Sequence, residues 1–400
     1  MNKKIIIAGT GCALADYLYT GMRFDSPKFS KYLSSQDGDG GLAPGRLVFT
    51  EELERFSGVP YSEISIELTG GKIPEAVNIG GPGLVSLINV SQLLSREDFE
   101  VRFYGGKGND ETADFIEHLV SKTPLNIDHY HRISKKRTPF TDVLSDPTYD
   151  NHHGERTFIN NIGAAWDYTP DLLGEGFFEA DIVCFGGTAL VPMIHDNLTL
   201  LLTRAKEKGC LTVVNTVFDF RNEKRNPGEP WPLVDKPENY QLIDLLIMDC
   251  EESLKISGRK SIEEAAQYFV DLDVTTLVIT NGAKEFYVFS NGKLFEKTEL
   301  QKLPVSQRVS HDFKNNPGSK GDTTGCGDNF AGGIISSLAR QLQTGKVGKL
   351  NLMEAIAWGV SSGAFACYYV GGTYIEHEEG EKHKIVEIFK YQYIQQISAQ

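Results

Sequence analysis

Short apolar runs rich in β-branched residues alternate with amphipathic helical patterns along most of this 400-residue chain. Such runs are typical of strands buried on both faces, and parallel strands need crossover helices between them. The alternation therefore predicts an α/β fold with a mostly parallel central sheet flanked by helices. The predicted strands include 4–8, 101–104, 181–185, 211–216, 242–248 and 275–280, and the predicted helices are 82–94, 112–121, 196–208, 261–270 and 329–342.

Two segments break this alternation, at about 17–69 and 137–166. Each contains shorter strand-like pieces, and the first is rich in Gly, Ser and charged residues near its middle. Because polar, glycine-rich stretches bury little apolar surface, we expect residues 36–45 to be a disordered surface loop. One helix start is better defined, since Ser261 followed by Glu264 matches a capping box.

The charge balance narrows the partners that the chain can bind. The chain has 40 Lys and Arg against 54 Asp and Glu, a formal net charge of −14. Nucleic acid and anionic membranes favour clustered cations, so we expect neither as a partner and expect a small polar ligand instead. The six cysteines lack C-x-x-C spacing, which argues against a zinc site or a disulfide scaffold and favours a cytoplasmic location. The apolar run at 5–8 is too short for a signal peptide.

Residues 321–333 read G-D-T-T-G-C-G-D-N-F-A-G-G and precede a helical apolar pattern. Glycines let the backbone approach a ligand closely, and the N–H groups at a helix start favour negative charge. Asp328 in the same turn is suited to accept a proton from an attacking hydroxyl. The turn Gly325-Cys326-Gly327 with Asp328 therefore predicts phosphoryl transfer to an alcohol; the alternative is that Asp328 only caps a helix.

This string resembles the second signature of the PfkB (ribokinase-like) carbohydrate kinase family, D-T-x-G-A-G-D. Asp322, Thr323, Gly325, Gly327 and Asp328 match it, and Cys326 stands where the family usually has alanine. The resemblance implies one ribokinase-like kinase domain over 1–400, with a small β lid built from the insertions 17–69 and 137–166. It also implies ATP and Mg²⁺ as cofactors and a possible homodimer through the lid.

The resemblance places the acceptor site in the N-terminal half. Asp16 matches the aspartate after the first strand that holds sugar hydroxyls, and Gly80-Gly81 matches the family's first signature. Val85 stands where members usually have an asparagine that binds a hydroxyl, so the usual sugar pose does not follow. Arg156 is a further candidate for contact with substrate from the lid. A solvated loop acid is the alternative for Asp16.

The nucleotide and metal candidates lie in the C-terminal half. Asp249 and Glu252 occupy the place of the family's N-x-x-E motif, and two carboxylates can hold Mg²⁺ through water. An acid pair at a helix start is the alternative. Glu285 replaces a glycine that the family has after its T-x-G. The resemblance assigns the nucleotide to Thr280, Gly282, Thr323, Gly325 and Gly363.

These features predict ATP-dependent phosphorylation of a hydroxymethyl group on a sugar or sugar derivative. Two alternatives stay open: a nucleoside kinase of the same fold, and a catalytically weak sugar-binding regulator, which the departures at Val85, Asp249 and Glu285 suggest. The G-T-G at 9–11 is a poor dinucleotide fingerprint because no helical pattern follows it.

Overall fold

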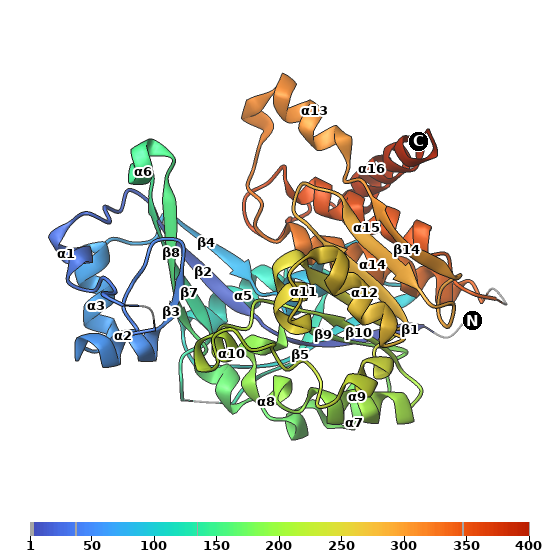
Figure 1. Ribbon diagram of the computed structural model, residues 1–400, viewed down its shortest axis with the longest axis horizontal. Coiled ribbons are helices and arrows are strands. Elements are labelled where there is room, and N and C mark those ends of the chain that lie inside the picture. Colours follow the sequence, from blue (N-terminus) through green and yellow to red (C-terminus); the bar gives the residue numbers. More distant parts are fainter. Residues whose placement is uncertain (1–3, 37, 134, 346–347, 400) are drawn as a thin grey trace.

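The computed structural model describes residues 4–36, 38–133, 135–345 and 348–399. Within these residues a nine-stranded sheet forms the body, and a five-stranded sheet projects to one side of it (Figure 1). The order in the body is β14-β13-β12-β11-β10-β9-β1-β5-β6. The neighbouring strands from β12 to β6 run parallel, whereas β12, β13 and β14 pair antiparallel at one edge.

The body strands are β1 (Ile5–Gly11), β5 (Phe99–Lys107), β6 (Asn126–Arg132), β9 (Ile182–Gly186), β10 (Leu211–Asn215), β11 (Leu245–Asp249), β12 (Thr276–Thr280), β13 (Phe286–Ser290) and β14 (Thr298–Leu303). Successive side chains of a strand point to opposite faces. In β1, Ile7 joins the apolar core on one face and Ala8 the core on the other. The sheet is therefore buried on both sides, as its apolar strands require.

Helices cover both faces of the body sheet. One face packs against α4 (Pro82–Leu93), α5 (Glu111–Val120), α14 (Cys326–Gln343), α15 (Leu352–Ala366) and α16 (Glu381–Ser398). The other packs against α7 (Gly174–Phe177), α8 (Pro192–His195), α9 (Leu198–Glu207), α11 (Cys250–Ser257) and α12 (Ile262–Asp271). Two further helices are α10 (Phe220–Arg225) and α13 (Gln307–Asn315). Helix α13 projects from the body in Figure 1.

The smaller sheet, called the lid here, has the strand order β3-β8-β7-β2-β4. Its strands are β2 (Leu14–Tyr19), β3 (Leu47–Phe49), β4 (Ala76–Gly80), β7 (Phe140–Asp146) and β8 (Glu155–Asn161). Helices α1 (Pro27–Ser30), α2 (Thr50–Ser57) and α3 (Tyr61–Thr69) share an apolar core with one face of this sheet, and α6 (Tyr149–His152) lies at its tip (Figure 1). The opposite face is free to cover the body.

The predicted fold class is confirmed: the chain is α/β with a mostly parallel sheet flanked by helices. The expected strand at 242–248 begins only at Leu245, because Pro237 opens a 3₁₀ helix that continues to Leu242. Ser261 caps α12 by accepting from the N–H of Glu264, while the Glu264 carboxylate accepts from the N–H of Lys260. The N-cap is thus present, but the Glu264 carboxylate bonds to the N–H of Lys260 instead of the N–H of Ser261 that a capping box would use.

The expected disordered loop at 36–45 was wrong for the residues described; residue 37 lies outside them. Leu42 is buried in the lid core and pairs with Leu33. The Asp39 carboxylate accepts from the N–H groups of Ser35, Gln36 and Gly41. One buried leucine and one aspartate that accepts hydrogen bonds from the backbone of its own loop are enough to order a segment of polar composition.

No helix in the described part of the chain has the length and apolar character needed to cross a bilayer.

Candidate active site

The turn before α14 leaves the helix N-terminus open. Gly325 is the N-cap residue with φ of +72°, and no side chain caps the helix. The first-turn N–H groups, including those of Gly327 and Asp328, have no acceptor within the helix. Nothing lies within 4 Å of the position that a Cβ on Gly327 would occupy. An anion can therefore approach this helix end closely.

The C-terminal segment after α15 holds the turn in place. A Cβ on Gly325 would lie 2.5 Å from the Cα of Gly372, so the two glycines pack backbone to backbone. The Asp322 carboxylate accepts from the N–H of Thr324 at 3.0 Å and from that of Gly371 at 3.3 Å. Glycine at 325 thus serves both the left-handed conformation and the close contact.

Asp328 is the third residue of α14 and its carboxylate is half-buried. Burial raises the pKa of Asp328 to about 7. The carboxylate also lies within electrostatic reach of Asp16, Cys12 and Glu252. A carboxylate titrating near neutral pH beside an open helix end is a suitable general base.

Asp16 on β2 lies on the lid side of this site. Burial raises the pKa of Asp16 to about 7, the Thr141 hydroxyl lowers it, and the nearby charges of Asp328 and Asp322 raise it again. A Cβ on Gly80 would lie 2.3 Å from Asp16 Oδ2, and one on Gly81 would lie 2.5 Å from the Cys12 carbonyl oxygen. The glycine pair therefore lets β4 approach Asp16 and the end of β1. Asp16, Gly80, Gly81 and Asp328 come together at one site.

The lid face that carries Asp16 has a polar row next to the body. Register pairs Asp16 with Asn78 on β4 and with Thr141 on β7, and Thr141 with Asn160 on β8. Asn160 Nδ2 donates to Thr141 Oγ1 at 3.0 Å, and Asn160 Oδ1 is buried without a partner. A Cβ on Gly371 would lie 2.8 Å from Asn78 Cγ, so this row touches the segment that holds the turn. The row offers hydroxyl-binding groups beside Asp328.

An apolar row follows on the same lid face. Leu18 pairs with Ala76 on one side and with Val143 on the other, and Val143 pairs with Phe158. Leu18 and Phe158 are half-buried and Val143 is buried, and none of the three joins the apolar clusters of the lid or the body. Two residues along a strand span about 7 Å, so this row lies one sugar-ring width beyond the polar one. A ligand that spans both rows must be polar at one end and apolar at the other.

Arg156 lies far out on the lid. It is exposed, and register pairs it with Ser145 near the lid tip. Four residues along β8 separate it from Asn160, which corresponds to about 13 Å. The structure therefore does not bring Arg156 together with Asp16 and Asp328.

Asp249 and Glu252 form the N-terminus of α11. Asp249 Oδ1 accepts from the N–H of Glu252 at 2.8 Å, and Glu252 Oε2 accepts from the N–H of Asp249 at 3.1 Å. This capping box is the structural role considered for the pair, and it uses one oxygen of each carboxylate. Burial first, then the charges of Asp249 and Asp328, raise the pKa of Glu252 to about 7. An excess of negative charge that faces Asp328 suits a divalent cation held through water.

The nucleotide candidates are spread over three elements. Thr280 ends β12, and Gly282 follows it with φ of +58° and open space around it. Thr323 is exposed in the turn before α14, and its carbonyl accepts from the N–H of Cys326. Gly363 is different, since it is buried inside α15, where a Cβ would lie 3.0 Å from the Cys326 carbonyl oxygen. Gly363 thus supports the turn from below.

Several polar residues at the site had no sequence signal. Asn78, Thr141 and Asn160 lie on three strands far apart in the chain, and only their register places them beside Asp16. Asn329 directly follows Asp328, and its side chain donates to the carbonyls of Gly325 and Gly372. Its position inside the motif was the available signal, because an open turn needs a side chain that holds its carbonyls.

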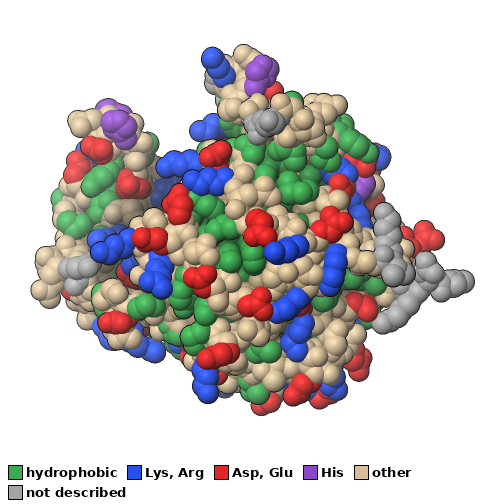
Figure 2. Space-filling model, turned by 45° about the vertical axis from the view of Figure 1, so that its right-hand side comes forward, with side chains coloured by type: hydrophobic (Ala, Val, Ile, Leu, Met, Phe, Trp, Pro, Cys, Tyr) green, Lys and Arg blue, Asp and Glu red, His purple; other side chains and the backbone are tan. Residues whose placement is uncertain are grey.

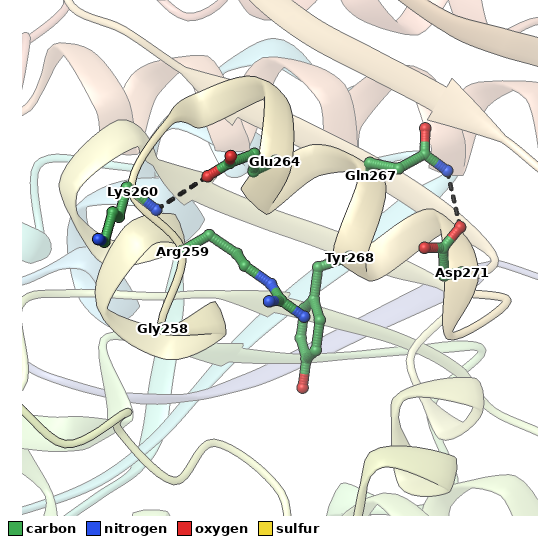
Figure 3. Close-up of a pocket in the computed structure, with 7 residues that line it drawn as sticks. All are labelled: Gly258, Arg259, Lys260, Glu264, Gln267, Tyr268 and Asp271. Carbon is green, nitrogen blue, oxygen red and sulfur yellow. Dashed lines mark hydrogen bonds between the residues drawn. The ribbon is translucent and has the colours of Figure 1, made fainter.

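Two hollows are visible on the surface of the protein, and only one of them lies between the lid and the body. Figure 2 shows a notch between the lid and the body, with Lys and Arg side chains around its floor. A separate surface hollow of about 460 Å³ is lined by α12 and the residues before it, with the Arg259 guanidinium over the Tyr268 ring (Figure 3). None of the predicted site residues lines that hollow. Its size alone therefore does not make it the reaction site.

The comparisons with known proteins agree with this geometry. The family described as pfkB family carbohydrate kinase matches residues 76–378. A ribokinase of Staphylococcus aureus (strain COL) is 23% identical over 288 residues, which make up 70% of this chain and 79% of that protein. The structure of adenosine kinase from Schistosoma mansoni in complex with 2-fluoroadenosine gives a TM-score of 0.66 at 17% identity and covers 92% of this chain and 96% of that one. Ribokinase from Thermotoga maritima gives a TM-score of 0.60 at 17% identity and covers 96% and 99%. The fold is therefore ribokinase-like.

Proposed function

Because this chain belongs to the pfkB family of carbohydrate kinases, we propose that it transfers the γ-phosphoryl group of ATP to a hydroxymethyl group of a sugar or sugar derivative. One observation carries the proposal: the Asp328 carboxylate stands in the first turn of a helix whose N-terminus is open. The N–H groups there face the transferring phosphoryl group, and the carboxylate faces the attacking hydroxyl.

In this reaction Asp328 accepts the proton of the acceptor hydroxyl while the bond to phosphorus forms. Asp16 and its row neighbours Asn78, Thr141 and Asn160 bind further hydroxyls and orient the acceptor. The N–H groups of residues 325–328 hold the phosphoryl oxygens as negative charge moves toward the leaving ADP. The lid excludes water, which would otherwise accept the phosphoryl group.

Asp249 and Glu252 would hold Mg²⁺ through water with the carboxylate oxygens that the capping box leaves over. When bound, Mg²⁺ neutralises charge on the phosphate oxygens. The site needs a cation because it gathers carboxylates. Asp16 lies within electrostatic reach of Asp322 and Asp328, and Glu252 lies within reach of Asp328. A triphosphate entering such a site requires a compensating cation.

The apolar row of the lid favours a second candidate, a nucleoside kinase. A free sugar of one ring that binds at the polar row does not extend to Leu18, Val143 and Phe158, so it gains little from them. A nucleoside has a hydroxylated ring and a planar apolar base, which matches a polar row followed by an apolar one. The adenosine kinase likeness supports this assignment only at the level of fold. The third alternative, a catalytically weak regulator, is disfavoured because the turn, Asp328 and Asp16 are assembled as catalysis requires.

The test is ADP release with ATP, Mg²⁺ and a panel of sugars, sugar phosphates and nucleosides. Turnover that Asp328→Asn abolishes, with one acceptor class preferred, supports the proposal. Phe158→Ala should lower kcat/KM for nucleosides about 10-fold or more and leave that for free sugars unchanged, because only the former reach the apolar row. Tight sugar binding without ADP release from any acceptor would instead identify a regulator.

Cytoplasmic location and self-association are part of the proposal. All six cysteines are free thiols, which suits a reducing compartment that supplies ATP. Helices α1 to α3 cover the outer lid face, so a dimer through the lid would use those helices rather than the sheet. Ile66 on α3 and Ile73 just after it are exposed there. Light scattering after size exclusion would measure this.

A further inference from the structure

A fully buried lysine lies behind the anion-binding turn. Lys382 on α16 is 0% exposed, and its Nζ donates to Asn329 Oδ1 at 2.9 Å and to Gln92 Oε1 at 3.0 Å. Both partners are neutral amides. Glu376 accepts from the backbone N–H of Lys382, and no ion pair to the ammonium forms among the residues described. Burial lowers the pKa of Lys382 to about 7, and the nearby Glu376 carboxylate raises it in part. A lysine is costly to bury in this way, so its presence calls for a role.

Asn329 connects this ammonium to the turn. Its Oδ1 accepts from Lys382 and, at 3.2 Å, from the Tyr369 hydroxyl. Its Nδ2 donates to the carbonyl of Gly325 at 2.9 Å and to that of Gly372 at 2.8 Å. The ammonium fixes which end of the amide faces inward, because a cation tolerates only the oxygen. The NH₂ group must then face the two glycine carbonyls that define the turn.

The chain of bonds ends on the peptide group that opens α14. The Gly325 carbonyl belongs to the same peptide group as the N–H of Cys326. The ammonium polarises the Asn329 amide, and the amide then binds the Gly325 carbonyl more strongly. This peptide group, whose N–H donates to the Thr323 carbonyl, is thereby held in the orientation that leaves the N–H groups of Gly327 and Asp328 open. A charge that never meets solvent thus acts on the open helix end through two hydrogen bonds.

We propose that Lys382 is a positioning residue for phosphoryl transfer: through the Asn329 amide, its ammonium orients and polarises the turn that holds the transferring phosphoryl group. This inference rests on the proposed function of that turn. The competing view is a purely structural tie that joins α16 to α4 and α14. The two views differ in one respect, since a structural tie needs the contacts but not the charge.

Gln92→Glu separates charge from contact. The new carboxylate keeps an oxygen beside Lys382 and neutralises its charge, so a structural tie is preserved or strengthened. The substitution also removes one bond, because Gln92 Nε2 donates to the Tyr374 carbonyl. A positioning role predicts that kcat falls about 10-fold while the KM for ATP changes little. The lost bond to Tyr374 lowers the Tm in either view, so kcat is the deciding readout. Unchanged kcat in Gln92→Glu would overturn the inference.

Lys382→Met removes the ammonium itself, and its matched control is Lys390→Met on the same helix. Lys390 is 8% exposed and pairs with Glu354 at 2.8 Å, away from the turn. Both variants should lose stability, but only Lys382→Met should lose kcat, by about 10- to 100-fold. Equal kcat losses in the two, at equal Tm losses, would favour the structural tie. If Lys382→Met does not fold, Gln92→Glu still decides.

A second measurement does not require the acceptor substrate to be known. ADP with aluminium fluoride and Mg²⁺ mimics the transferring phosphoryl group, and its Kd is measured by calorimetry. The inference predicts weaker binding of this mimic in Gln92→Glu, with the Kd for ADP alone unchanged. Wild-type protein that neither turns over nor binds the mimic would overturn the proposed function and the inference together, whereas equal binding by wild type and variant would overturn only the inference.

Discussion

Helices α14 and α11 both start at the proposed reaction centre, yet one N-terminus is open and the other is closed. Gly325 begins α14 with no side-chain cap, whereas Asp249 begins α11 with a reciprocal capping box to Glu252. The two ends lie within electrostatic reach of each other, because the charge of Asp328 on α14 raises the pKa of Glu252 on α11. Glycine at one N-cap and aspartate at the other make the difference.

The difference teaches how one site can hold both an anion and its counterion. The open end offers backbone N–H groups, so it suits phosphate. The closed end has satisfied its own N–H groups and offers spare carboxylate oxygens, so it suits a cation. Backbone groups therefore bind the anion at α14, beside the Asp328 carboxylate, and side chains bind the cation at α11. Each variant below breaks or sharpens that division.

Asp328→Asn should have the largest effect. Asparagine keeps the shape and removes the base, so we expect kcat to fall by about 10²–10⁴ with the fold intact. The measurement is steady-state ADP release with the preferred acceptor, alongside circular dichroism. Asp249→Asn is the matched control at the closed end, since asparagine also caps helices well. Equal losses in both would show that the open and closed ends do not divide the work.

The pH dependence of stability sharpens the same variant. Burial raises the pKa of Asp328 to about 7, so the folded protein keeps a proton that the unfolded chain releases near pH 4. Stability is therefore lost as pH rises from about 4 to 7, and the Asp328→Asn variant escapes that loss because its side chain carries no titratable proton. At pH 8 we expect this variant to exceed wild type in free energy of unfolding by up to about 2 kcal/mol, measured by urea denaturation. At pH 4 the two free energies should be nearly equal. A variant less stable at pH 8 would contradict the assigned burial.

The open end was predictable from sequence, and the closed end only in part. Gly325, Gly327 and Asp328 stand next to one another, so their spacing alone indicated an anion-binding turn. Asp249 and Glu252 were recognised as a pair, but the capping box depends on side-chain orientation. The acceptor surface depends on register between β2, β4, β7 and β8, whose residues lie far apart in the chain. A turn formed by neighbouring residues can be predicted from local sequence, whereas a surface formed by several strands depends on their register and cannot.

Gly327→Ala should separate stability from catalysis at the open end. The added methyl meets nothing within 4 Å, and alanine favours a helix over glycine by about 0.5–1 kcal/mol. The same methyl occupies the face where a phosphoryl oxygen approaches the N–H groups, so kcat should fall about 10²-fold. Urea unfolding and kcat are measured together. The exposed Gly318→Ala, where a Cβ would come only within 3.7 Å of Asn316 Oδ1, should leave kcat unchanged. Full activity in Gly327→Ala would move the phosphoryl site away from this turn.

Glu252→Gln tests the closed end. Glutamine still completes the capping box, so the helix start should persist. Because burial raises the pKa of Glu252, losing its charge should not lower the Tm at pH 8. The expected effect is a rise of about 10-fold in the free Mg²⁺ that gives half-maximal rate, measured at fixed ATP. An unchanged Mg²⁺ dependence would leave the cap as the only role of this carboxylate.

Cys326→Ala should have the smallest effect, and that smallness is informative. Cys326 is the first residue of α14, and its thiol lies 3.4 Å from the thiol of Cys367, the C-cap residue of α15. The turn itself does not require the thiol. Alanine keeps the backbone N–H, so kcat should stay within about twofold of wild type while the Tm falls slightly from lost packing. The same assay used for Asp328→Asn measures it. If kcat instead fell as far as in Gly327→Ala, the thiol itself would act at the open end, and the contrast between anion binding by backbone at α14 and cation binding by side chains at α11 would fail.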